Sequence, residues 1–128
     1  MESLNIPATD ITPGIRFNAS TGVLEIEGNS LPEDVIGFYK DIFQWVQNYI
    51  EHPNSTTTIN IRLNYFNSSS SKVLLDILSI LEGLTDQNVK VEVNWFYLEL
   101  DDDMLQTGKE FESLVKIPFK FVNYMDNK

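Results

Sequence analysis

The sequence Ile59-Asn60-Ile61-Arg62-Leu63-Asn64-Tyr65-Phe66-Asn67-Ser68-Ser69-Ser70-Ser71-Lys72 changes its hydrophobic period at the four serines. Before them, apolar and polar residues alternate, which is typical of a strand with one buried face. After them, apolar residues recur at spacings of three and four, as on the buried side of a helix: Val73, Leu74, Ile77, Leu78, Leu81 and Leu84. The stretch predicts a strand over residues 56–66, a helix that starts within the serines, and an exposed junction between them.

Two more patterns precede this junction. Short apolar runs over residues 15–18 and 23–28, separated by a Ser-Thr-Gly turn, predict a β-hairpin. Ser30-Leu31-Pro32-Glu33 predicts the start of a helix with Ser30 as its capping residue, and His52-Pro53 predicts its end. Residues 1–14 are polar and contain two prolines, so we expect an irregular lead-in there.

Two strands and a third helix are predicted after the junction. The strands cover residues 89–95 and 117–122, and the helix begins at Asp101-Asp102-Asp103, where negative charge favours a helix start. The chain therefore predicts one α/β domain over residues 1–128, of order ββαβαβαβ, with a mixed, mostly parallel sheet. The strands are half-polar, so we expect the helices on one face and an open polar face opposite, comprising Glu25, Glu27, Asn60, Arg62, Asn64, Lys90, Glu92 and Asn94.

The composition excludes several kinds of partner and site. The 19 acidic and 9 basic residues give a net charge of −10, which makes nucleic acid and anionic membranes unfavourable partners. Without cysteine, disulfides, zinc–thiolate sites and cysteine nucleophiles are excluded. No apolar run is long enough to span a bilayer and no signal peptide is recognisable, so a cytoplasmic location is expected.

Groups suited to catalysis are scarce. The single histidine, His52, stands at a predicted helix end, where a solvated side chain is ordinary. Phosphate-binding loops, catalytic triads and zinc-binding motifs are absent. The acidic residues Glu99, Asp101, Asp102 and Asp103 suit a hard cation, but helix initiation explains them more simply. We therefore predict a non-enzymatic protein with no metal and no cofactor.

Aromatic residues stand at two strand ends, where open α/β sheets bind ligands and partners. Tyr65 and Trp95 continue the inward alternation and are expected in the core. Phe66 and Phe96 are out of phase with it, so they are candidates for a partner interface, together with Tyr97. A small-molecule-binding module with a pocket lined by Trp95 and Tyr97 is the rival hypothesis.

The serine run has two interpretations. Ser68 or Ser69 caps the helix, which needs only one hydroxyl. Alternatively, the run is a regulatory phosphorylation site, because a phosphate there meets unpaired backbone N–H groups and the positive end of the helix dipole, with Lys72 in the first turn to assist.

Several segments resemble the SiaC family of bacterial regulatory phosphoproteins, and the resemblance covers roughly residues 9–124. The most specific of them is Leu63-Asn64-Tyr65-Phe66-Asn67-Ser68-Ser69-Ser70-Ser71-Lys72 with Leu74-Leu75-Asp76. The others are Thr12-Pro13, Ile15-Arg16-Phe17, Thr21 to Ile26, Pro32-Glu33 with Phe38-Tyr39, Val93 to Tyr97, Asp101 to Met104, Gly108 and Pro118-Phe119.

The resemblance implies a fold like that of STAS-type anti-sigma-factor antagonists. It also implies a switch protein that cycles between a kinase and a PP2C-type phosphatase. In such a switch the unmodified form binds and activates a diguanylate cyclase, which raises cyclic di-GMP and favours biofilm. The family's phosphoacceptor is typically a threonine directly after the asparagine. In this sequence that position is Ser68, with Ser69 as the neighbouring alternative and Asn67, Ser70, Ser71 and Lys72 around it.

Overall fold

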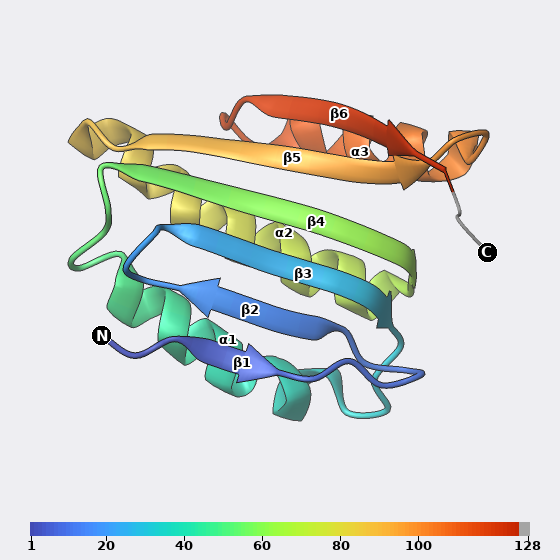
Figure 1. Ribbon diagram of the computed structural model, residues 1–128, viewed down its shortest axis with the longest axis horizontal. Helices are drawn as coiled ribbons and strands as arrows, with labels where there is room; N and C mark the ends of the chain where they lie inside the picture. The colour runs from blue at the N-terminus through green and yellow to red at the C-terminus, as the bar shows by residue number, and fades with distance from the viewer. Residues whose placement is uncertain (126–128) are drawn as a thin grey trace.

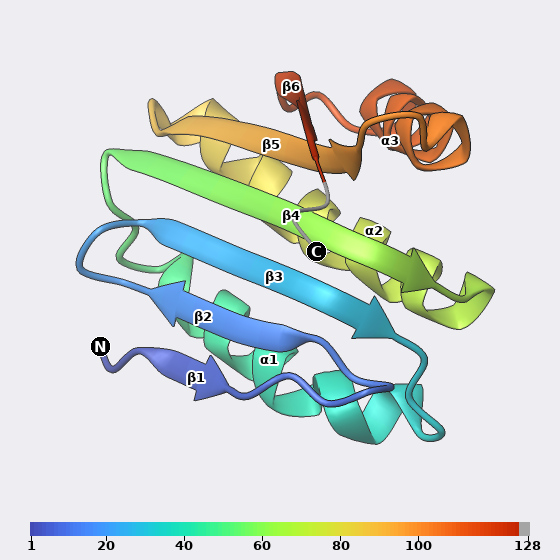
Figure 2. The ribbon, with the colours of Figure 1, turned by 45° about the vertical axis from the view of Figure 1, so that its right-hand side comes forward.

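In residues 1–125, the part of the chain that the computed structural model describes, six strands lie side by side in chain order and three α-helices cover one face (Figures 1 and 2). The elements are β1 (Leu4–Ile6), β2 (Gly14–Asn18), β3 (Val23–Ser30), α1 (Val35–Tyr49), β4 (Thr56–Phe66), α2 (Ser68–Glu82), the 3₁₀ helix η1 (Gly83–Gln87), β5 (Lys90–Leu98), α3 (Asp102–Leu114) and β6 (Phe119–Tyr124). The predicted α/β class, with helices on one face, is confirmed.

The sheet is mixed, as expected. β1, β2 and β3 pair antiparallel, whereas β3 to β6 pair parallel through helical crossovers. The prediction of an irregular lead-in was wrong for β1, which pairs with β2 and is followed at once by Pro7. A strand of three residues is too short to show a hydrophobic period. The segment just before β1 is held to α1 by the Trp45 Nε1–H, which donates to the Glu2 carbonyl at 2.8 Å.

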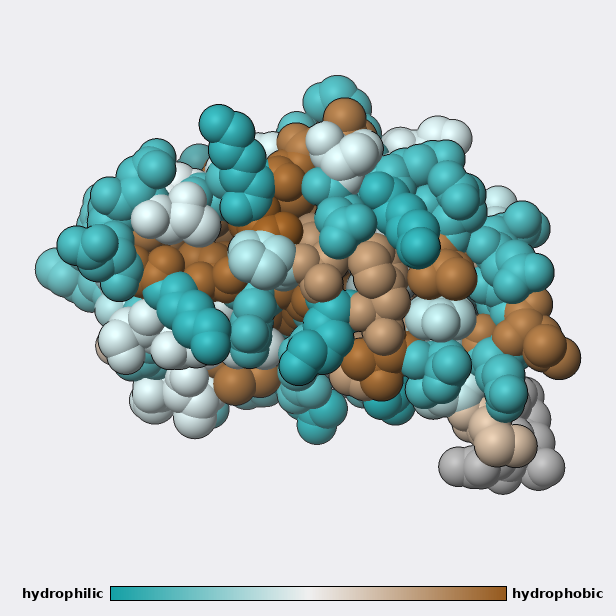
Figure 3. Space-filling view, turned by 90° about the horizontal axis from the view of Figure 1, so that it is seen from above, coloured by the Kyte–Doolittle hydropathy of each residue, from teal (hydrophilic) through white to brown (hydrophobic). Residues whose placement is uncertain are grey.

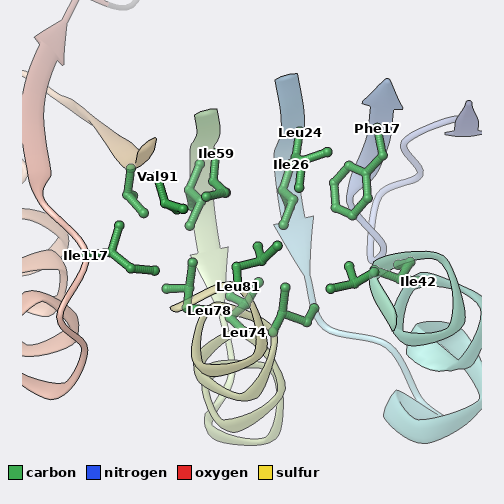
Figure 4. Close-up of a cluster of buried hydrophobic side chains, with 14 of the residues drawn as sticks. Phe17, Leu24, Ile26, Ile42, Ile59, Leu74, Leu78, Leu81, Val91 and Ile117 are labelled. Atoms are coloured by element: carbon green, nitrogen blue, oxygen red, sulfur yellow. The ribbon is translucent and has the colours of Figure 1, made fainter. Parts of the chain in front are cut away.

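The core lies between the sheet and its helices (Figure 4). Phe17, Leu24, Ile26, Ile59 and Val91 point from the strands toward α1 and α2, whose side chains Ile42, Leu74, Leu78 and Leu81 meet them. All nine are almost completely buried. The two periods in the sequence, two in the strands and 3.6 in the helices, bring these apolar faces together.

The opposite face of the sheet is open and polar. The side chains that the alternation placed there, including Glu25, Glu27, Asn60 and Lys90, are exposed or half-buried. Among them the Arg62 guanidinium lies 4.7 Å from the ring centre of Phe96 and 4.8 Å from that of Tyr124. These cation–π contacts hold β4, β5 and β6 together on the solvent side.

The start of α1 differs from the sequence-based expectation. Asp34 is the N-cap, and its Oδ1 accepts from the Gly37 N–H at 3.0 Å. Ser30 instead ends β3, where it pairs with Phe66 and is fully buried. The prediction failed because Ser30 continues the extended strand, so the helix begins only after Pro32.

The end of β4 holds a second difference. The β3–β4 register shifts by one residue, so that Leu63 pairs with Gly28 and Tyr65 with Asn29, leaving Asn64 without a partner on β3. One extra residue exchanges the inner and outer faces of a strand. Tyr65 is therefore 57% exposed, not buried as predicted. Phe66 turns inward, with ring centres 6.2 Å from Trp95 and 6.1 Å from Phe111, so its assignment as out of phase with the core was wrong.

Trp95, in β5, packs against α3. It is fully buried, as predicted, and its Nε1–H donates to the Met104 carbonyl at 3.0 Å. The helix comes this close because Gly108 has no side chain: a Cβ there would lie 2.6 Å from Trp95 Nε1.

Gly108→Ala should destabilise the protein, by about 1–3 kcal/mol, because overpacking against a buried ring forces the ring or the helix to move. Gly83→Ala is the matched control, since a Cβ at Gly83 meets nothing within 4 Å, and this variant should be neutral or slightly stabilising. Urea unfolding of both variants measures the difference. Equal free energies of unfolding would contradict the packing argument.

Candidate functional site at the strand-to-helix junction

Asn67 starts α2 at the carboxyl end of β4. Its Oδ1 accepts from the Ser70 N–H at 2.9 Å and from the Ser69 hydroxyl at 3.1 Å, and its carbonyl accepts from the Ser71 N–H at 2.9 Å. The capping residue is therefore Asn67, and the expectation that Ser68 or Ser69 caps the helix was wrong. Asparagine is among the best capping residues because its carbonyl oxygen reaches the first turn.

Ser70 is the buried member of the serine run. Its hydroxyl donates to the Ser30 carbonyl at 3.0 Å and accepts from the Ser30 hydroxyl at 2.8 Å. Because the Ser30 hydroxyl donates its only proton to Ser70, the Tyr39 hydroxyl, 2.7 Å away, must be the donor to Ser30 Oγ. This hydroxyl chain, Tyr39 to Ser30 to Ser70, is fully buried and joins α1, β3 and the first turn of α2.

Tyr39 is suited to head the hydroxyl chain as a donor. Burial raises the pKa of its phenol above the ordinary value of 10.0, and the hydrogen bond with Ser30 opposes that rise in part. The tyrosine therefore keeps its proton at any physiological pH. The order of donors along the hydroxyl chain is fixed as a result.

Ser68 differs from Ser70 in its exposure and in the hydrogen bonding of its hydroxyl. It is exposed, it is the first residue of α2, and its hydroxyl makes no hydrogen bond with any residue in the described part of the chain. The backbone N–H groups of Ser68 and Ser69 likewise have no acceptor within residues 1–125. The Lys72 ammonium lies 3.4 Å from the Asp76 carboxylate, so the cation that was expected to assist a phosphate already has an anionic partner.

A cleft of about 470 Å³ opens beside Ser68, where the first turns of α2 and α3 meet at the carboxyl edge of the sheet. Its lining residues are Asn64, Tyr65, Phe66, Asn67, Ser68, Ser71, Asp101, Asp103, Met104 and Thr107. The two carboxylates make the α3 wall acidic. Asp101 is the N-cap of α3, its Oδ1 accepting from the Met104 N–H at 3.0 Å, which bears out helix initiation as the role of the acidic run.

Only some of the candidate residues that the sequence indicated line this cleft. Ser68, Ser71, Asn67 and Phe66 come together in the cleft, whereas Phe96 lies on the open face and Tyr97 packs against the core. Neither Trp95 nor Tyr97 lines the cleft, so it is not the pocket that the small-molecule hypothesis predicts. Tyr65 does line it and was missed, because the extra residue in β4 leaves no mark on the apolar alternation.

Residues 1–125 offer little else for chemistry. They contain no group of three or more His, Asp or Glu side chains placed to hold a metal ion. His52 is exposed just after α1. Among these residues no helix is both long enough and apolar enough to cross a bilayer.

Comparison with known proteins gives a family and close structural relatives. The family model described as SiaC family regulatory phosphoprotein matches residues 6–124. An uncharacterised protein of Pseudomonas aeruginosa strain UCBPP-PA14 is 29% identical over 119 residues, which are 93% of this chain and 94% of that protein.

Two solved structures from Pseudomonas aeruginosa share the fold. Apo-SiaC is 29% identical, with a TM-score of 0.87 over 95% of this chain and 99% of the other. The crystal structure of the diguanylate cyclase SiaD in complex with its activator SiaC contains a chain that is 28% identical, with a TM-score of 0.89 over 94% of this chain and 99% of that one.

Ser70→Ala should lower the free energy of unfolding by about 1–3 kcal/mol, because it leaves the buried Ser30 hydroxyl without an acceptor. Ser69→Ala is the control: that hydroxyl is exposed, and its removal should cost less than about 0.5 kcal/mol. Chemical denaturation of both variants tests this. A Ser70→Ala protein as stable as Ser69→Ala would show that the hydroxyl chain is dispensable.

Proposed function

Because the chain belongs to the SiaC family of regulatory phosphoproteins, we propose that it is a non-enzymatic partner switch controlled by reversible phosphorylation of Ser68. A protein kinase adds the phosphate and a PP2C-type phosphatase removes it. The unmodified form binds a diguanylate cyclase and activates it.

The observation that carries the choice of residue is the free hydroxyl of Ser68. A kinase needs an acceptor that it can reach, and Ser68 is exposed at the rim of the cleft with its hydroxyl unbonded. Ser70 is unsuited because it is fully buried and its hydroxyl is used twice. Ser69 is exposed and remains the alternative, although its hydroxyl is bonded to Asn67.

A phosphate on Ser68 would meet two opposing influences. The free N–H groups of Ser68 and Ser69 and the dipole of α2 favour an anion at this end of the helix. Asp101 and Asp103, on the far wall of the cleft, repel it. The modification adds about −1.5 to −2 charges at neutral pH, so it changes the cleft from acidic to strongly acidic.

The cyclase is proposed as the output partner because a similar protein forms a complex with one. SiaC of Pseudomonas aeruginosa is the activator of the diguanylate cyclase SiaD and forms a complex with it. The present chain superimposes on nearly the full length of its match in that structure. A shared fold over the whole chain supports a shared class of partner.

The acceptor assignment predicts a simple pattern of mass changes. Incubated with Mg·ATP and the cognate kinase of its host, wild-type protein and Ser69→Ala should each gain one phosphate, whereas Ser68→Ala should gain none. Intact-mass spectrometry measures this. Full phosphorylation of Ser68→Ala, with loss of the modification in Ser69→Ala, would move the switch to Ser69.

The partner assignment predicts opposite behaviour of two variants. Ser68→Ala should bind and activate the host's diguanylate cyclase as wild type does, and Ser68→Glu should bind at least about tenfold more weakly, because a carboxylate brings part of the phosphate charge. Binding and cyclic di-GMP synthesis are both measured. Cyclase activity that is independent of added wild-type protein would overturn the output role.

A further inference from the structure

Leu100, in the turn between β5 and α3, is placed against both its side-chain and its backbone preferences. The residue is 91% exposed, and its φ of +76° lies in the left-handed region. In residues 1–125 the other non-glycine residue with positive φ is Asn88, a type that tolerates this conformation. A bulky apolar residue in this state is strained, and such strain is found mostly at functional sites.

The fold does not need the leucine side chain. The turn is held by backbone hydrogen bonds, from the Asp101 N–H to the Leu98 carbonyl at 2.9 Å and from the Glu99 N–H to the Tyr124 carbonyl at 2.8 Å. Glycine would make the same bonds without strain and would expose no apolar surface. Stability alone therefore favours glycine at this position, so another requirement accounts for leucine.

Leu100 is one residue away in the sequence from the wall of the cleft that contains Ser68. It directly precedes Asp101, whose side chain lines the cleft opposite Ser68. Tyr65, 57% exposed, lines the same cleft from the end of β4. Figure 3 shows hydrophobic surface among hydrophilic side chains at its right-hand end, the end of the molecule where β5 turns into α3 in Figure 1.

The effect of a phosphate on the charge of the cleft indicates which kind of partner surface binds there. The cleft already carries Asp101 and Asp103, so a phosphate would strengthen the attraction to a basic partner. A partner that phosphorylation releases is therefore not held at this edge by basic groups, whereas an apolar surface, where a dianion is costly to bury, fits such release.

From these observations we propose that Leu100 is an apolar anchor, assisted by Tyr65, that inserts into a hydrophobic pocket of the diguanylate cyclase. The phosphate on Ser68 releases the cyclase because it places a strongly hydrated charge at the edge of this apolar contact. The inference rests on the proposed function and adds to it the residues and the chemistry of docking.

The test compares cyclase binding with protein stability. Leu100→Gly should bind the purified cyclase at least about tenfold more weakly than wild type, as for removal of a buried anchor, while its melting temperature stays equal or rises. Leu100→Met, which keeps the apolar surface, should retain binding. Controls are Asn88→Gly for the backbone and Leu114→Ala for an exposed leucine at the other end of α3, and both should bind as wild type does.

Two outcomes separate the inference from the proposed function. If wild type and Ser68→Ala bind the cyclase and Leu100→Gly binds equally well, the anchor is wrong and the switch stands. If wild type binds no cyclase, the proposed function fails and the anchor fails with it.

Two further measurements address other occupants of this edge. Affinity that falls steeply from about 50 to about 500 mM salt would show an electrostatic contact and overturn the apolar one. Light scattering that shows a wild-type dimer, lost in Leu100→Gly while cyclase binding is unchanged, would make a second copy of this chain the occupant and overturn the proposal.

Discussion

The buried hydroxyl chain of Tyr39, Ser30 and Ser70 is the constraint on which the geometry of the junction depends. Each hydroxyl donates its single proton to one acceptor. The three side chains therefore hold the end of β3, the first turns of α1 and the start of α2 at fixed distances. With Ser70 turned inward, the helical rotation brings Ser68 and Ser69 to the surface. The exposure of the proposed switch residue thus follows from a hydrogen-bonded lock beneath it.

The extra residue in β4 gives this edge of the sheet its surface. Without it, the alternation would bury Tyr65 and send Phe66 into solvent. With it, Phe66 closes the core against Trp95 and Phe111, and Tyr65 stands in the wall of the cleft. The same edge receives the acidic start of α3, because parallel strands deliver their following helices to one end of the sheet. The topology therefore brings the serine hydroxyl and the aromatic ring of residues 64–71 together with the carboxylates of residues 101–107.

Most of the fold could be predicted from the sequence, because it depends on periods that repeat over many residues. The long strand over residues 56–66, both amphipathic helices around it and the one-sided sheet follow from such patterns. The failures are local: β1 is too short to show a period, and Ser30 carries a capping signal that strand pairing overrides. At the candidate site, Ser68 and Asn67 could be singled out from the sequence, but the exposure of Tyr65 and Leu100 depends on a register shift and a left-handed turn, which leave no trace in hydrophobicity.

The different roles of three of the four serines explain how the proposed phosphorylation of Ser68 would leave the protein folded. Ser70 stabilises the fold and is inaccessible, Ser69 supports the Asn67 cap, and Ser68 contributes no side-chain bond to either. A phosphate on a residue that the fold does not use costs little native stability, so its free energy goes into the interaction with partners. Leu100, which precedes Asp101 of the opposite cleft wall, is similar in this respect, because the fold tolerates its strain and exposure but gains nothing from them. Residues that stability does not require, set close to residues that it does, are what a phosphorylation-controlled docking surface needs.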